Sequence, residues 1–506
     1  MLSYYDYKVQ KCAPNIISSL YMQKVKKLPE QKRAKVLVAG AGGSIGSAVS
    51  RALAEEYEVV ALVGSRERLQ QEEPGLKLTW RSCEPFSRRD VETAVTGCDY
   101  LIYLIHTRVP TARMDQAECR DMDLLIADNV ARAASRQGVK RIIYLGGLIQ
   151  DTNASMGVRE KRNDIIEALS FYGTSLTVLR AGLVVAPGSN TVRLLANTAT
   201  RLPIVLLPPW ANKRRQPIAL ADVIRAVRFC LAHDDTRNNQ YEIGGPQILT
   251  YRQMLQAAAL VLRKKQLIVN APFLTPRLYG WYLRLLNRGV HPTLIELAVK
   301  YLGHDSVARS NPLQQFIEKG AQKPRKAIEP YIKQWAQLPP NPRQPFFKKY
   351  TVALRTMSNV RSIQRINLPR GRNAAWVAET YFQWLPRFSR LMLICEVDAD
   401  RTCRYYNRFP KLHLLTLSYK PELSSPDRQM YFITGGLLAR GHEDLNPRME
   451  FRDVLKGRYT IVALHDFRPV LPWFLFALTQ AYIHLIIMRN FQKYIAGLTT
   501  GPDRKT

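Results

Sequence analysis

Short apolar runs alternate with amphipathic stretches through the first half of the chain. Six runs have the length and the Val, Ile, Leu and Tyr content of buried strands: residues 36–38, 58–63, 76–81, 99–106, 141–145 and 175–180. Four intervening stretches place apolar side chains at the spacing of a helix: residues 45–53, 89–96, 122–136 and 164–169. Strands that alternate with helices in this way predict an α/β fold with a doubly wound parallel sheet.

Three glycines, Gly40, Gly43 and Gly46, follow the first apolar run and lead into the first helical stretch. Only glycine lets a backbone turn this sharply and approach a pyrophosphate this closely, and the following helix presents unpaired N–H groups to the anion. Three glycines alone are weak evidence, but the strand before them, the helix after them and the next strand at residues 58–63 make up a βαβ unit. The sequence therefore predicts a Rossmann-type dinucleotide site, with a phosphate loop that contains Gly40, Gly42, Gly43, Ser44, Ile45 and Gly46.

The end of the second strand-like run bears on the choice of cofactor. The chain continues there as Gly64, Ser65 and Arg66, with no acidic residue to bind the ribose hydroxyls of NAD. Ser65 and Arg66 would suit a 2′-phosphate, so we expect NADP(H) rather than NAD(H), although Arg66 could instead be a solvated loop charge. Glu84, which follows the third run, is a further expected cofactor contact.

Four motifs together resemble the atypical and extended branch of the short-chain dehydrogenases/reductases. The first is the GxxGxxG spacing, and the others are LTVLRAGLVVAPGS at residues 176–189, QPIALADVIRAV at 216–227 and YEIGGPQILTYRQML at 241–255. The resemblance covers roughly residues 35–255 and points to the set near the nitrogen-repression regulators and the NADPH-binding accessory subunit of respiratory complex I. It implies a ligand crevice at the carboxyl ends of the strands, with a substrate lobe beside it.

The catalytic residues that this resemblance implies are missing. Ordinary members use a tyrosine, a lysine four residues later, and a serine at the end of the preceding strand. The tyrosine and lysine positions fall on Val158 and Arg162, or on Gly157 and Lys161 after a shift of one residue. The serine position falls near residues 146–147, which are both glycine. Arg162 could keep the contact with the cofactor ribose, but an arginine cannot act as an acid at neutral pH.

Two other side chains are candidates for the missing acid. His106 ends a strand-like run in the expected crevice, and Tyr144 lies in the next run. Tyr103 and Asp151 are further substitutes near the carboxyl ends of the sheet. The alternative for each tyrosine is an aromatic side chain of the core, where such runs are usually buried.

The remaining chain divides by composition. Residues 1–33 contain no signal-peptide core and predict a basic amino-terminal arm, and residues 34–303 hold the cofactor-binding domain with its lobe. Residues 304–351 are rich in proline, lysine and arginine, as expected of a linker between domains. Residues 352–498 then form a second domain.

The second domain follows a different pattern from the first. Six strand-like runs accompany an amphipathic helix at residues 374–385, and a long apolar helix at 473–494 closes the chain. Several antiparallel strands around one long carboxyl-terminal helix resemble the α+β helix-grip fold of START and polyketide-cyclase-like domains, which implies an apolar ligand. Residues 474–488 could instead span a membrane, but their short length and two polar residues favour a helix that covers a sheet.

Composition adds two constraints. The formal net charge is +33 and the pI is near 10.0, which favours anionic partners such as cofactor phosphates or an anionic membrane surface. No nucleic-acid-binding motif accompanies this charge, so we expect no specific nucleic acid as a partner. The seven cysteines include no CxxC pair, which argues for a reducing compartment and against a zinc ribbon or a disulfide framework, and we expect no metal site. We therefore expect a cytoplasmic protein, peripheral at the inner membrane if it binds lipid.

These observations leave three functions open. The absence of the usual catalytic set favours a nucleotide-dependent sensor or binding protein with an apolar-ligand domain. The first alternative is an NADPH-dependent oxidoreductase or isomerase that acts on an apolar substrate through a non-standard acid. The second is a structural accessory protein at a membrane or respiratory complex. The sequence names neither the substrate nor a protein partner.

Overall fold

The computed structural model describes residues 33–64, 69, 73–107, 112–148, 156–186, 189–287, 290–320, 359–389, 393–438 and 447–499. The chain forms two compact units, one made of residues 1–109 with 129–350 and the other of residues 110–128 with 351–506. Most of the predicted amino-terminal arm lies outside the described residues.

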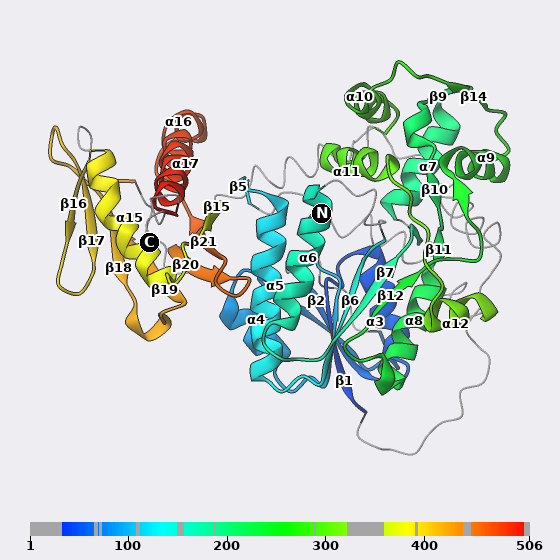
Figure 1. The fold of residues 1–506 in the computed structure, drawn as a ribbon, viewed down its shortest axis with the longest axis horizontal. Helices are drawn as coiled ribbons and strands as arrows, with labels where there is room; N and C mark the ends of the chain where they lie inside the picture. The colour runs from blue at the N-terminus through cyan, green and yellow to red at the C-terminus, as the bar shows by residue number, and fades with distance from the viewer. Residues whose placement is uncertain are drawn as a thin grey trace, which may run out of the picture. The chain divides into compact units, whose positions relative to one another are not determined.

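A seven-stranded sheet forms the centre of the first unit (Figure 1). Its order is β12-β7-β6-β4-β1-β2-β3, and every neighbouring pair is parallel. The strands are β1 (Lys35–Ala39), β2 (Glu58–Val63), β3 (Leu78–Ser82), β4 (Tyr100–Tyr103), β6 (Arg141–Gly147), β7 (Leu176–Ala181) and β12 (Gln240–Ile243). The helices between them are α3 (Ser44–Leu53), α4 (Arg88–Val95), α5 (Cys119–Arg136), α6 (Met156–Ser170) and α8 (Leu220–Ala232). The predicted doubly wound parallel sheet is confirmed.

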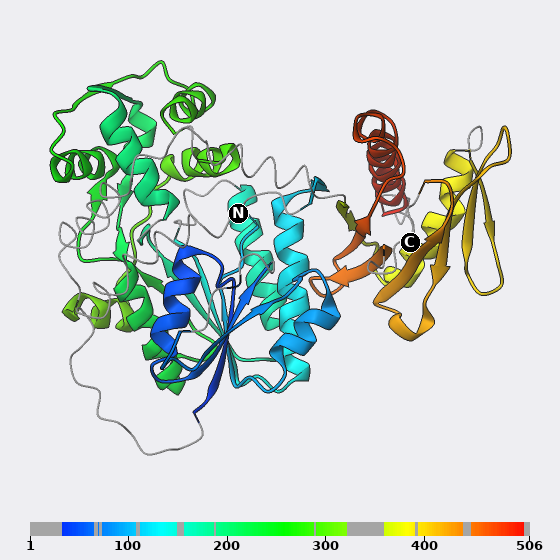
Figure 2. The same ribbon diagram turned by 180° about the vertical axis from the view of Figure 1, so that it is seen from behind.

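Helices cover both faces of this sheet. Figures 1 and 2 show α4 and α6 on one face and α3 and α8 on the other. Strands covered on both faces are continuously apolar, and Val36, Val38, Ile102 and Ile143 are all fully buried. The direction of winding changes between β1 and β4, so the ligand crevice of such a sheet opens at their carboxyl ends.

A lobe with its own core is built from two segments of the chain, one before α8 and one after β12. Its elements are α7 (Asn190–Arg201), β9 (Ile204–Leu207), α9 (Tyr251–Val261), β14 (Leu267–Asn270), α10 (Pro276–Leu286) and α11 (Pro292–Leu302). Pro276 and Pro292 begin α10 and α11, and the side chains of Thr275 and His291 cap these helices. These two prolines of the lobe therefore start short helices.

The stretch expected to be a linker contains a packed helix. α12 (Pro312–Gly320) buries Leu313 and Ile317 in the core of the first unit, beside α8 and β12. Its Gln314 side chain also accepts a hydrogen bond of 2.7 Å from the Gly244 backbone N–H. The first unit therefore extends at least to residue 320, and the predicted start of the linker at residue 304 is wrong. The abundance of proline and basic residues in this stretch concealed the few apolar residues that α12 buries.

The second unit is built on an eight-stranded sheet of order β16-β17-β18-β19-β20-β21-β15-β5. Its strands are β5 (Met114–Ala117), β15 (Val360–Asn367), β16 (Leu393–Val397), β17 (Cys403–Asn407), β18 (His413–Tyr419), β19 (Arg428–Gly435), β20 (Arg448–Val454) and β21 (Tyr459–Phe467). All pairs are antiparallel except β15 with β5. Three helices pack on it: α15 (Ala374–Phe388), α16 (Trp473–Leu478) and α17 (Gln480–Thr499).

Two of these strands were not predicted. β17 has the sequence CRYYN, which contains no aliphatic residue, and β5 has the largely polar sequence MDQA. β5 belongs to the first half of the chain, yet residues 110–128 are part of the second unit. The domain boundaries expected from composition therefore miss a segment that crosses between the halves of the chain.

The closing helices cover the sheet through both apolar and polar contacts. Met488, Phe491 and Ile495 are fully buried. His484 Nε2 lies 3.0 Å from Ser362 Oγ, and Gln492 donates a hydrogen bond of 2.9 Å to the Arg365 carbonyl on β15. Among the described residues, one segment, Trp473–Leu498, is long and apolar enough to cross a membrane; an 18-residue window within it has a mean hydropathy of 1.2, and 22% of that window is buried.

A cluster of charged side chains is buried inside the second unit. Glu450 of β20 accepts hydrogen bonds from Arg428 and Arg452, at 2.6 and 2.7 Å. Arg452 also donates a hydrogen bond of 3.0 Å to Asp128 of α5. Burial alone would raise the pKa of Glu450, but Arg452 and Arg428 outweigh it and hold that pKa well below its ordinary range. The carboxylate therefore stays charged within the core.

His465, on β21, gives this unit a predicted pH dependence. It is fully buried, and burial together with nearby Arg448 lowers its pKa below the ordinary value of about 6.5. The unfolded chain therefore binds a proton at a higher pH than the folded chain does. The contribution of His465 to stability is present at neutral pH and is lost as pH falls below about 6.5.

Between pH 7 and pH 4.5, we expect the free energy of unfolding to fall less in His465→Gln than in the wild type, by on the order of 1 to 3 kcal/mol. Urea unfolding of wild type and variant at several pH values would measure the difference. The two pH profiles must be compared, because burial also raises the pKa of Asp453 to about 6, so this carboxyl group favours the folded state as pH falls. Parallel pH profiles for the two proteins would contradict the prediction.

Candidate functional site

The glycine loop after β1 has a backbone that excludes side chains at two positions. Gly40 has a φ of +97°, and a Cβ added there would lie 2.9 Å from the Leu104 carbonyl carbon. A Cβ on Gly46 would lie 2.3 Å from the Gly40 carbonyl oxygen. Gly40 therefore permits the turn next to β4, and Gly46 permits the close packing of α3 on that turn.

The tip of this loop is open. Gly42, Gly43 and Ser44 are exposed, and Ile45 turns inward to pack on the core. Gly43 is the N-cap of α3, with φ −88° and ψ 163°, and no side chain caps the helix. The first turn of α3 also carries no acidic residue. Its backbone N–H groups and the positive end of the helix dipole can therefore bind an anion at the crevice.

The other expected cofactor contacts lie in different parts of the first unit or outside the described residues. Ser65 and Arg66 lie outside the described residues. Glu84 lies in the turn after β3, where its carboxylate accepts a hydrogen bond of 3.2 Å from the Phe86 N–H. Cys83 N–H bonds to the Val63 carbonyl, so this turn adjoins the end of β2. Arg162 lies half-buried on α6.

The candidate acids form an aromatic cluster at the ends of β4 and β6. The rings of Tyr103 and Tyr144 are 5.8 Å apart, and those of His106 and Tyr144 are 6.0 Å apart. His106 Nε2 lies 3.4 Å from the Leu145 carbonyl oxygen, and its side chain is half-buried. Tyr103 and Tyr144 are buried, as the core alternative expects, so His106 is the more accessible of the two named candidates. Asp151 lies outside the described residues.

The side chain of Tyr144 occupies the space beside Gly146, one of the two positions expected for the usual serine. A Cβ added to Gly146 would lie 3.1 Å from both the Cζ and the hydroxyl of Tyr144. A Cβ added to Gly147 would lie 3.8 Å from the hydroxyl of Tyr301, which comes from α11 of the lobe. The end of β6 is therefore lined by two tyrosines where the standard set would place a serine.

Tyr301 lies near the end of β6, and the sequence analysis did not name it. Buried Arg215 donates a hydrogen bond to its backbone carbonyl, and burial lowers the pKa of Arg215 to about 10, so this cation stays charged at neutral pH. Five residues further on, Ser306 donates a hydrogen bond of 2.6 Å to the Leu148 carbonyl, just after β6. These two contacts hold the segment of Tyr301 beside the crevice. No local motif marks it, because it meets β6 only through the tertiary fold.

Residues 40–171 match a family model described as NAD(P)H-binding. This stretch contains the glycine loop and runs from the end of β1 through α6. The parallel sheet, the open loop and this match agree, and the first unit contains an NAD(P)-binding Rossmann domain.

Individual similar proteins match either a short part of the chain or a longer part at low identity. The auxiliary protein GraX of Staphylococcus aureus is 31% identical over 140 residues, which are 28% of this chain and 41% of GraX. A nucleoside-diphosphate-sugar epimerase from S. aureus is 16% identical, with 58% of this chain and 99% of the epimerase aligned at a TM-score of 0.45. A Citrobacter sp. triphenylmethane reductase complexed with NADP(H) is 15% identical, with 58% and 99% aligned at 0.47. Both scores are below 0.5, so these two likenesses support no statement about activity.

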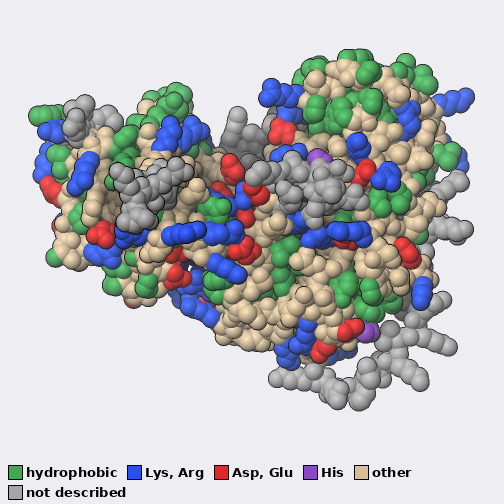
Figure 3. Space-filling view, viewed as in Figure 1, with side chains coloured by type: hydrophobic (Ala, Val, Ile, Leu, Met, Phe, Trp, Pro, Cys, Tyr) green, Lys and Arg blue, Asp and Glu red, His purple; other side chains and the backbone are tan. Residues whose placement is uncertain are grey.

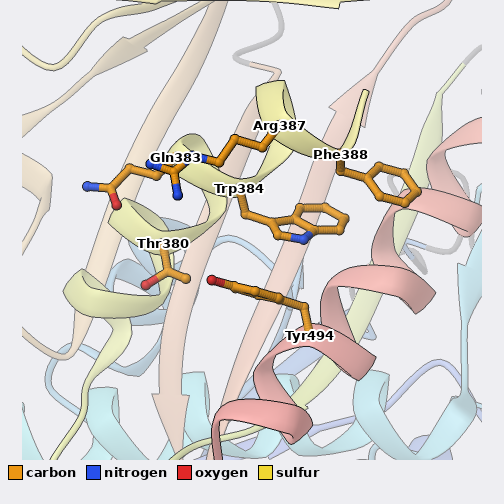
Figure 4. A pocket seen from close by; sticks show the side chains of 6 residues that line it. All are labelled: Thr380, Gln383, Trp384, Arg387, Phe388 and Tyr494. Atoms are coloured by element: carbon orange, nitrogen blue, oxygen red, sulfur yellow. The ribbon is translucent and has the colours of Figure 1, made fainter. Parts of the chain in front are cut away.

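A separate pocket of about 310 Å³ lies in the second unit, between α15 and α17 (Figure 4). Trp384 stacks on Phe388 at a ring distance of 4.6 Å, and Tyr494 faces them from α17. The space between α15 and the sheet is filled by buried aromatic side chains, including Phe382 and Phe451. The described pocket therefore lies between the helices rather than between helix and sheet, where a START-like domain would hold its ligand.

Proposed function

We propose that this protein binds NADP(H) at the glycine loop and acts as a nucleotide-dependent sensor or binding protein. The proposal is supported by a contrast within the crevice: the features that bind a dinucleotide are present, and the standard catalytic residues are not all present. The loop has the backbone and the open helix terminus that a pyrophosphate needs. The position of the usual serine falls on Gly146 or Gly147, and that of the tyrosine on Val158 or, after a shift of one residue, Gly157. The lysine position correspondingly holds Arg162 or Lys161, so neither count provides a tyrosine.

The description of GraX as an auxiliary protein agrees with a role other than catalysis. An apolar ligand for the second unit stays part of this proposal, and the aromatic pocket between α15 and α17 is where such a ligand would be sought. A cytoplasmic location is likewise proposed from the scattered cysteines of the sequence.

A second function has one observation in its favour. The Tyr301 hydroxyl reaches the end of β6 from the lobe and lies close to Gly147. In an oxidoreductase, this phenol could donate the proton to the carbonyl oxygen of a bound ketone while the nicotinamide supplies the hydride. His106, half-buried nearby, is the other acid available for this alternative.

One experiment separates the two functions. We expect NADPH to bind, while its absorbance at 340 nm stays constant with a panel of apolar ketones and aldehydes, because no standard acid is in place. Turnover that is lost in Tyr301→Phe, with NADPH affinity unchanged, would establish the oxidoreductase and overturn the sensor. His106→Gln serves as the matched variant for the other acid.

The preference for the phosphorylated cofactor is tested by Arg66→Asp. If the guanidinium binds the 2′-phosphate, this variant weakens NADPH by roughly 10- to 100-fold and leaves NADH nearly unchanged. Equal effects on both nucleotides would assign Arg66 to the solvated loop.

A further inference from the structure

The lobe of the first unit carries an apolar surface at its tip. α10 buries one face in the lobe core, through Tyr279 and Leu283, but Leu278, Trp281 and Leu285 form an exposed stripe on the other face. These three residues are spaced by three and four positions, so they point to the same side of the helix. Trp281 is 61% exposed. α10 is therefore apolar on two faces, and the lobe covers only one of them.

The surface continues onto the neighbouring strands. Ile204 of β9 lies opposite Leu267 of β14, and both are exposed. The Tyr282 hydroxyl accepts a hydrogen bond from the Leu206 N–H, which places α10 directly beside β9. Figures 1 and 2 both show α10, β9 and β14 at the end of the lobe farthest from the seven-stranded sheet. We call the exposed side chains of α10, β9 and β14 the tip patch.

The chain around the tip patch is basic and almost free of acids. Residues 182–221 contain five Lys or Arg and no Asp or Glu, and residues 243–295 contain seven and none. Arg201, Arg277 and the three residues 263–265 are exposed next to the elements of the patch. Glu296 of α11 pairs with Arg284. Figure 3 shows hydrophobic side chains gathered over the tip, with Lys and Arg beside them.

We propose that the tip patch docks on an anionic lipid surface, with Trp281 and its apolar neighbours inserted at the level of the headgroups and the surrounding Lys and Arg bound to lipid phosphates. An apolar stripe with a basic rim is the pattern of interfacial helices, and tryptophan favours the boundary between headgroups and acyl chains. A protein partner of ordinary composition would present both charge signs, whereas this surface offers carboxylates almost nowhere. The proposal does not depend on nucleotide binding.

The test is co-sedimentation of the full-length protein with vesicles. We expect binding to phosphatidylcholine vesicles with about one third phosphatidylglycerol, weak binding to phosphatidylcholine alone, and a loss of binding as ionic strength rises to about 0.5 M. The double variant Leu278→Gln/Leu285→Gln should weaken binding by roughly tenfold or more. The matched control is Leu412→Gln/Leu423→Gln, which changes two similarly exposed leucines of the second unit.

A depth measurement identifies which residues enter the bilayer. Lipids brominated near the headgroup should quench tryptophan fluorescence in the wild type, and Trp281→Phe should remove most of that quenching. Undiminished quenching in Trp281→Phe would overturn the proposal in favour of the apolar closing helix, which carries Trp473. Equal vesicle binding by the α10 variant and its control would overturn it as well. If the wild type self-associates without vesicles and the α10 variant does not, the tip patch binds a second copy of the chain and the lipid proposal is overturned.

Discussion

Gly43→Asp is expected to weaken the affinity for NADP(H) by roughly 100-fold or more, while the protein stays folded. Gly43 is exposed, and its φ of −88° suits any residue. A Cβ there meets only the Gly40 carbonyl oxygen, at 3.8 Å. The new carboxylate would cap the free N–H groups of α3, which adds only about a few tenths of a kcal/mol of stability, because glycine is itself a tolerated N-cap residue. It would also place a negative charge where the pyrophosphate must lie. Calorimetry measures the affinity, and thermal unfolding checks the fold.

The matched control is Gly43→Asn, which can cap the same N–H groups without a charge. We expect it to bind NADPH more weakly than the wild type but clearly better than the aspartate variant. If Gly43→Asp binds NADPH as well as the wild type does, the nucleotide phosphates do not lie at the start of α3, and the site assigned here is wrong.

Arg452→Met is expected to destabilise the second unit by about 3 to 5 kcal/mol. Arg452 is 1% exposed and bonds to both Glu450 and Asp128. Methionine fills a similar volume but leaves two buried carboxylates without this cation, and the cost of burying an uncompensated charge is large. Hydrogen exchange of the β20 and β21 amides at increasing urea concentration reports the opening of this unit.

An exposed ion pair of the same unit supplies the control. Arg404 pairs with Asp398 at the surface, so Arg404→Met should cost less than about 1 kcal/mol. Similar, small effects of both substitutions would show that the buried cluster contributes little. Asp128→Asn should also weaken exchange protection of β20, because Asp128 belongs to the segment that joins the second unit.

The nucleotide loop could be predicted because its physics is local. A turn with positive φ at Gly40 and close packing at Gly46 require glycine, and both requirements appear within seven residues of sequence. The apolar strands of the parallel sheet could be predicted for a similar reason, since strands covered on both faces must be apolar throughout.

The missed features depend on contacts between distant parts of the chain. Tyr301 reaches Gly147 across more than a hundred intervening residues, and nothing near it in the sequence marks that contact. β5 is polar and half-buried, so no apolar pattern shows that it pairs with β15. The buried cluster around Glu450 alternates with apolar neighbours on β20, and its charged residues look like those of a solvated strand face until the strand partners are known.

The most direct test is a calorimetric titration of the wild-type protein with NADPH, NADP⁺ and NADH. The open helix terminus after Gly43 predicts saturable binding of one dinucleotide per chain, with the phosphorylated forms bound more tightly. Failure of all three nucleotides to bind the folded protein would contradict a working nucleotide site and, with it, both the sensor and the oxidoreductase.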